Sequence, residues 1–339
     1  MTPDASPGFR PAPLLGSLAF ATLAMTAISM AVGYAPLPLG PAVTDLLAGQ
    51  KSLPALVLYE LRLPRALLGA LVGFSLGMAG AAMQGLLRNP LAEPGVIGIS
   101  SAAAFGAVLA FYSGLSASLA LALPLGGIAG ALVATVILFI LLGRGASTTT
   151  TTLILAGVAL NSFAGAATAL ALNLAPNPYA ALEIVFWLMG SLADRSMNHV
   201  ALALPLMLTG WLLLASTAPA LDALSLGEDT AASLGFDLGW LRARLIGGAA
   251  LAVGSAVAVT GAIGFVGLVV PHLLRPLVGH RPGRLLIASG LGGAILVLAA
   301  DIGVRLMPIR PELKLGVVMA LIGAPFLFAL VQRLRREAL

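Results

Sequence analysis

The chain has 339 residues, of which 59% are apolar and only 9% are charged, and its mean hydropathy is +1.04. This composition excludes a soluble globular domain, so lipid must be the solvent for most of the protein surface. The net charge of +5 is spread along the chain, which argues against a nucleic-acid-binding face. Cysteine is absent, which excludes disulfides and thiolate metal sites.

Apolar stretches of about 20 residues, the length of one helical bilayer crossing, recur along nearly the whole chain. They do not alternate as the strands of a transmembrane barrel do, so the sequence predicts an all-α integral membrane protein of about ten spans. In chain order the predicted spans are 14–32, 66–87, 96–111, 117–142, 153–174, 200–215, 245–260, 263–278, 285–300 and 315–331.

These spans form a single predicted membrane domain over residues 14–333, with tails at 1–13 and 334–339. An even number of spans places both tails on one side of the membrane. Basic residues are more frequent on that side, so the positive-inside rule predicts that both tails are cytoplasmic.

The second predicted span carries glycine at every fourth position, at Gly69, Gly73 and Gly77. Glycines at this spacing lie on one helix face and let a neighbouring backbone approach closely. Part of this region, residues 65–86, also resembles residues 244–268, five spans later. An odd number of spans inverts the second copy, so we expect two inverted five-helix halves, as in many transporters.

Residues 219–241 are too polar to cross the membrane and lie on the predicted cytoplasmic side. Ser225 and Glu228 have the spacing of a capping box, and Gly235 suits the end of a short helix of about nine residues. One interpretation is a solvated loop helix. The other is a coupling helix that docks on a cytoplasmic partner.

The absence of a nucleotide-binding loop from this sequence favours the coupling helix. The chain has two lysines, Lys51 and Lys314, and neither lies in the G-x-x-x-x-G-K-[ST] loop that cradles nucleotide phosphates. Any ATP hydrolysis through such a loop must therefore come from another subunit.

Three arginines lie at the opposite end of the predicted spans, namely Arg62, Arg65 and Arg305. They could simply extend their charged ends to the membrane surface. Alternatively they form a basic rim that binds carboxylates of an external partner, since a guanidinium group pairs with carboxylates in a fixed geometry.

Proline and polar residues interrupt several spans and mark candidate hinges or pathway positions. These candidates are Gln84, Asn89, Pro90, Pro271, His272 and Pro325. The histidines have no metal-binding spacing and no catalytic grouping stands out, so we expect neither a catalytic site nor a bound metal or cofactor.

Several motifs along the chain resemble those of the FecCD-type permeases of type II ABC importers. The resemblance rests on 62–65, 84–85, 88–95, 187–192, 226–235, 264–275, 300–305, 312–313 and 323–326, in order along the chain. One departure is Lys314, which stands where the family usually has proline.

The resemblance implies two permease subunits of ten helices each, here most simply a homodimer, with two ABC ATPase subunits and an external substrate-binding protein. It implies that Arg62, Arg65 and Arg305 face acidic residues of the binding protein. It also implies that the segment with Leu226, Gly227, Glu228, Ala231, Leu234 and Gly235 transmits ATPase motion to the bundle.

The resemblance therefore implies a multi-pass inner-membrane permease that works by alternating access, and an iron–siderophore complex is the expected cargo because this is the commonest role in the family. Cobalamin (vitamin B12) and haem are the alternatives for the cargo. An ion-coupled secondary transporter is a remote alternative, because the spans contain very few of the buried carboxylates that such a protein uses.

Overall fold

The computed structural model describes residues 11–33, 36–142, 150–309 and 311–337, and the regular structure within these ranges is helical. Most of the tail predicted at 1–13 lies outside the described residues, and α16 extends into the tail predicted at 334–339. In chain order the elements are α1 (Pro11–Ala31), α2 (Leu39–Leu47), α3 (Leu53–Leu56), the π-helical turn η1 (Val57–Arg62), α4 (Leu63–Leu87), the 3-10 turn η2 (Pro94–Ile97), α5 (Ile99–Tyr112), α6 (Leu115–Ser118), α7 (Ala122–Leu142), α8 (Thr150–Asn173), α9 (Pro178–Leu188), α10 (Met197–Ser216), α11 (Ala218–Leu224), α12 (Glu228–Ser233), α13 (Leu238–Thr260), α14 (Val266–Leu274), the 3-10 turn η3 (Pro276–Val278), α15 (Pro282–Leu306) and α16 (Leu315–Glu337).

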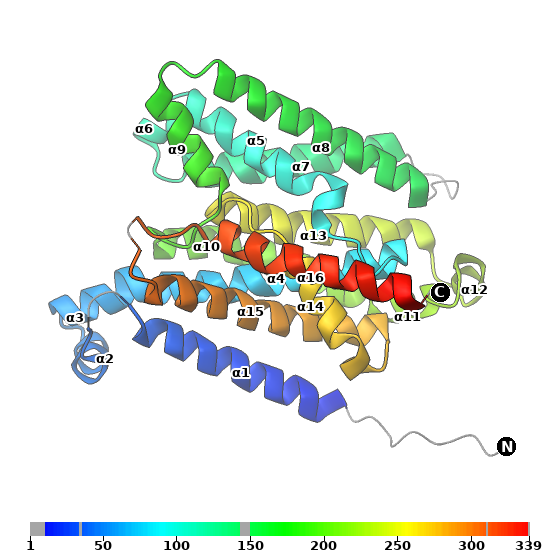
Figure 1. Cartoon of the computed structure of the whole chain (residues 1–339), viewed down its shortest axis with the longest axis horizontal. Helices are drawn as coiled ribbons and strands as arrows, with labels where there is room; N and C mark the ends of the chain where they lie inside the picture. Colours follow the sequence, from blue (N-terminus) through cyan, green and yellow to red (C-terminus); the bar gives the residue numbers. More distant parts are fainter. Residues whose placement is uncertain (1–10, 34–35, 143–149, 310, 338–339) are drawn as a thin grey trace.

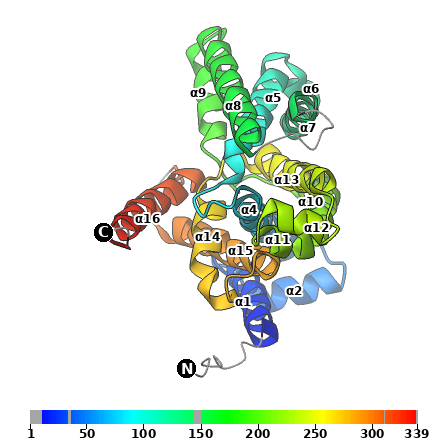
Figure 2. The ribbon, with the colours of Figure 1, turned by 90° about the vertical axis from the view of Figure 1, so that its right-hand side faces the viewer.

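The long helices run alongside one another between two ends of a bundle (Figure 1). One end carries α12, the start of α1 and the end of α16, and we call it the α12 end. The other carries α2, α3, α6 and α9, and we call it the α9 end. Seen from the side, α5–α9 form a group at one edge and α16 stands at another (Figure 2). The first predicted span therefore begins at the same end of the bundle at which the last predicted span ends.

Eight helices in the described ranges are long and apolar enough to cross a membrane. They correspond to eight of the ten predicted spans. The spans predicted at 96–111 and 263–278 are shorter, because α5 has 14 residues and α14 has 9. The sequence did not predict α9, an apolar helix of 11 residues whose N-terminus is capped by the Asn177 side chain.

The two short helices occupy equivalent places in the two halves, since α5 is the third predicted span and α14 the eighth. Both begin after a residue in the left-handed region, Gly98 (φ 76°) before α5 and Phe265 (φ 68°) before α14. The packing repeats as well: α4 contacts α14 and α15, while its counterpart α13 contacts α5 and α7. This repetition supports the predicted pair of inverted halves.

The contact between α4 and α15 is the most extensive between two helices of the described residues, and it depends on glycine. A β-carbon on Gly73 would collide with the backbone of Gly293, and one on Gly77 would collide with the carbonyl of Ser289. Gly69 faces Leu298, whose side chain would lie 2.9 Å from an added β-carbon. The glycine face predicted from the sequence is therefore confirmed as the contact with α15.

We expect Gly73→Leu to destabilise the protein by roughly 3 kcal/mol, because the side chain would force α4 and α15 apart. Thermal unfolding of the purified protein in detergent measures the effect. Gly165→Leu is the matched control, because Gly165 is exposed on α8 with open space around its β-position. Equal losses in the two variants would contradict the proposed role of the glycine face.

Candidate functional site

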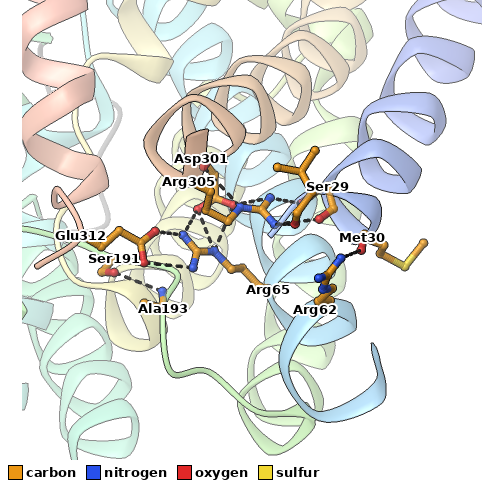
Figure 3. A network of polar contacts seen from close by, with 10 residues as sticks. Ser29, Met30, Arg62, Arg65, Ser191, Ala193, Asp301, Arg305 and Glu312 are labelled. Carbon is orange, nitrogen blue, oxygen red and sulfur yellow. Dashed lines mark hydrogen bonds and ion pairs between the residues drawn. The ribbon is translucent and has the colours of Figure 1, made fainter. Parts of the chain in front are cut away.

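At the α9 end, Arg65 lies between two carboxylates (Figure 3). Its Nε donates to both carboxylate oxygens of Asp301, at 3.0 and 3.1 Å, and its Nη2 lies 2.8 Å from Asp301 Oδ1. The opposite edge of the guanidinium faces Glu312, with Nη1 3.2 Å from Oε2 and Nη2 against Oε1. Arg65 therefore joins α4 both to α15 and to the segment that precedes α16.

Arg305 shares Asp301 and reaches the C-terminus of α1 (Figure 3). Its Nη2 lies 2.9 Å from Asp301 Oδ2, and its Nη1 donates at 2.7 Å to the carbonyls of Ser29 and Val32. The last carbonyls of a helix have no partner within the helix and carry the negative end of its dipole, so a cation is favourable there.

Arg62 binds the same helix end from the other side. Its Nη1 donates to the carbonyl of Met30 at 3.0 Å and to that of Ala31 at 2.6 Å. Two arginines from different elements therefore cap the C-terminus of α1.

The open basic rim expected from the sequence is not present in this conformation. Arg62 is 7% exposed and Arg305 is 6% exposed, and both have internal partners that neutralise or satisfy them. The physical reason is that a charge among apolar helices must be paired or hydrogen-bonded to be tolerated. Docking of an external protein on these arginines stays a prediction.

The sequence analysis did not predict the carboxylates that complete this network. Asp301 is 1% exposed and sits one helical turn before Arg305, a spacing that indicates an ion pair on one helix face. Glu312 gave no comparable local signal, because its partner Arg65 is 247 residues away in the chain.

The hinge and pathway candidates divide into two groups. Gln84 is buried near the end of α4, where its amide donates to the carbonyl of Gly267 at 3.3 Å and its oxygen accepts from Arg275. Asn89 and Pro90 are exposed in the turn that follows, and the Asn89 side chain accepts from the amide of Leu91 at 2.9 Å.

The remaining candidates lie on α14 and α16. Pro271 is buried inside α14, and the ring of the adjacent His272 packs edge-on against Phe326 of α16, with centroids 5.6 Å apart. Pro325 lies inside α16, which continues through it. The structure therefore places His272 of α14 against Phe326 of α16, the residue that follows Pro325.

A carboxylate that the sequence analysis passed over fixes the start of α14. Glu93 accepts a hydrogen bond from the amide of Phe265 at 2.7 Å and so ties the turn after α4 to this helix. Burial raises the pKa of the Glu93 carboxyl, and the hydrogen bond from Phe265 partly opposes that effect.

At the α12 end, the predicted short helix is present as α12, but its predicted capping box is wrong. Ser225 donates to the carbonyl of Asp222 at 2.6 Å instead, and Glu228 pairs with Arg242 at 3.1 Å. The backbone before α12 is turned by Gly227 at φ 118°, a conformation that favours glycine. The helix has six residues rather than about nine.

The coupling candidates differ in exposure. Ala231 is a fully buried residue of α12, while Leu226 and Leu234, which precede and follow the helix, are 68% and 61% exposed. Gly235 ends the helix with φ 89°. Ala231 therefore seats the short helix, and the two leucines form its accessible apolar surface.

Comparison with known proteins identifies similar transport proteins. A sequence model described as the FecCD transport family matches residues 21–333. The chain is 42% identical to the vitamin B12 import system permease protein BtuC of Vibrio cholerae, over 83% of this chain and 84% of that protein. It is 38% identical to the hemin transport system permease protein HmuU of Yersinia pestis, over 82% and 84% of the two chains. It is 37% identical to the Fe(3+)-citrate import system permease protein YfmE of Bacillus subtilis, over 94% and 95%.

A solved structure shares the fold. The inward-facing conformation of a transporter assigned to the metal-chelate type of ABC transporters matches with a TM-score of 0.81 and 30% identity. The match covers 95% of this chain and 99% of the other.

We expect Asp301→Asn to lower the free energy of unfolding by about 3–5 kcal/mol, because it leaves two buried guanidinium groups without their shared counter-charge. Thermal unfolding in detergent is again the measurement. Glu60→Gln removes one negative charge from an exposed position on η1 at the same end and should have almost no effect. A stable Asp301→Asn protein would show that the network does not hold these helices together.

Proposed function

Because this chain belongs to the FecCD transport family, we propose that it carries a bulky metal chelate across the inner membrane by alternating access. It is a permease of the type that serves ABC importers of metal chelates, vitamin B12 and haem. The observation that carries the proposal is the family match over residues 21–333, which spans every long helix except the start of α1 and the end of α16.

The inverted halves support the proposed mechanism. Alternating access needs two arrangements of the same helices around one pathway, and many transporters obtain them from inverted repeats with discontinuous helices. Here the short helices α5 and α14 occupy equivalent places in the two halves. Each begins at its own break in the backbone, at Gly98 and at Phe265, whereas α4 and α15 each continue for 25 residues.

The cargo that we propose first is an iron–siderophore complex, with a corrinoid as the second candidate. The iron proposal draws support from the Fe(3+)-citrate permease among the relatives. The corrinoid is favoured by relatives named for vitamin B12 or cobalamin import, at 42% and 38% identity. Both cargoes are large, and neither requires a chemical step by this chain.

The proposed partners follow from what the chain lacks and what it exposes. We place the α12 end in the cytoplasm with both termini, because basic residues are more frequent on that side. Two ATPase subunits bind there, since neither lysine of this chain lies in a phosphate-binding loop. Leu226 and Leu234 then offer the ATPase an apolar contact on each side of α12. A second copy of the chain completes the pathway, and an external substrate-binding protein delivers the cargo at the α9 end.

The cargo proposal is tested by uptake in a strain that lacks this gene. We expect restored import of a radiolabelled ferric siderophore when the gene is returned, and loss of import when cellular ATP is depleted. Labelled cobalamin and haem are measured in parallel. Import of cobalamin alone would replace the iron proposal with the corrinoid, and failure to import any of the three would contradict the proposed cargo class.

The coupling proposal is tested on the complex with its ATPase subunits in proteoliposomes. We expect Leu234→Gln or Leu226→Gln to lower transport roughly tenfold, the effect of losing about 1.4 kcal/mol of contact energy at a docking surface. ATP hydrolysis measured in the same vesicles should become independent of cargo. Leu47→Gln is the matched control for the ATP-hydrolysis measurement, because Leu47 is 83% exposed on α2 at the end opposite the proposed ATPase contact. Normal transport by both variants would contradict the coupling role of α12.

A further inference from the structure

The three arginines at the α9 end differ in whether they can receive a carboxylate from outside. Arg62 and Arg305 direct their guanidinium groups at the C-terminus of α1 and are 7% and 6% exposed. A new partner would have to break these hydrogen bonds and leave the end of α1 uncapped. Arg65 is different, because one of its two carboxylate partners lies near the surface.

The two partners of Arg65 are held very unequally. The side chain of Asp301 is 1% exposed, lies within α15 and also pairs with Arg305. The side chain of Glu312 is 19% exposed and belongs to the connection between α15 and α16. Releasing Glu312 leaves Arg65 paired with Asp301, whereas releasing Asp301 would remove the carboxylate that Arg65 and Arg305 share.

The edge of Arg65 that faces Glu312 already has the geometry of a carboxylate site. Nη1 and Nη2 each point at a different oxygen of Glu312, as in a two-pronged pair of guanidinium and carboxylate. Such a pair is geometrically specific, and it is weak when partly exposed to water. One external carboxylate in the same position would satisfy the same two nitrogens.

We propose that Glu312 is an internal stand-in for a carboxylate of the external binding protein, which replaces it on Arg65 when that protein docks. This inference rests on the proposed function, because it requires a binding protein as partner. It makes Arg65 the exchangeable arginine of the three and makes Glu312 a competitor that weakens docking in the resting permease.

The exchange also gives docking a route into the bundle. Glu312 lies three residues before Leu315, where α16 begins. At the start of α16 the amide of Gly316 donates to the carbonyl of Gly190 at 3.4 Å, next to the end of α9. A released Glu312 would free the segment that joins α15 to α16 at a point adjacent to this contact.

The test measures docking of the purified substrate-binding protein on the complete permease–ATPase complex in nanodiscs, at low and at high salt. We expect Glu312→Gln to tighten docking about three- to fivefold, the effect of removing a competing ion pair of about 0.6–1 kcal/mol. Glu60→Gln is the matched control, because it removes the same charge from an exposed position at the same end of the bundle, outside the ion pairs of Arg65. Arg65→Gln should weaken docking, and adding Glu312→Gln to the Arg65→Gln protein should then change docking no further.

The possible results distinguish failure of the carboxylate exchange from failure of the proposed function. Equal docking by the Glu312→Gln and Glu60→Gln complexes would overturn the exchange and leave the proposed function intact. No docking by the unsubstituted complex would overturn the partner in the proposed function, and the exchange with it. If Glu312→Gln fails to assemble, Glu312→Asp keeps the charge but shortens the reach to Arg65. It should then tighten docking by a smaller factor, and unchanged docking would overturn the exchange.

Discussion

Asp301 is the constraint on which the α9 end of this bundle depends. One carboxylate, almost fully buried, pairs with the guanidinium groups of both Arg65 and Arg305, and Glu312 supplies the second negative charge. These buried groups are shielded from bulk water, so they remain charged only because each is paired with a carboxylate. Through Asp301 the end of α1, the start of α4, the end of α15 and the segment before α16 become one unit.

The glycine contact between α4 and α15 acts on the same two helices by a different force. At Gly73 and Gly77 the backbones meet directly, so dispersion contacts hold the helices along their length. The ion pair between Arg65 and Asp301 then joins the start of α4 to the last turns of α15. A tightly joined α4–α15 pair provides a rigid frame against which the short α14 packs, while α5 and α12 pack against α13.

A firmly joined helix pair next to short, separate helices suits a transporter of the FecCD family. The proposed movement needs parts that shift and parts that do not, and the shift is easiest where a helix is short or begins at a break in the backbone. Glu93 and Gln84 tie the break at α14 to the end of α4, so the turn at Asn89 and Pro90 is coupled to the frame. Exposed Leu226 and Leu234 offer the proposed ATPase a contact on the α12 side of that frame.

The sequence by itself determined the membrane environment, the helical class, most of the spans, the glycine face and the family. Those features depend on composition, periodicity and motif order, which are local properties of the chain. The tertiary structure alone decided that α5 and α14 are short, that Ser225 does not cap α12, and that Arg62 and Arg305 turn inward. The reason is distance along the chain: Arg65 meets its carboxylates 236 and 247 residues away, and no local pattern records which buried charge will neutralise which.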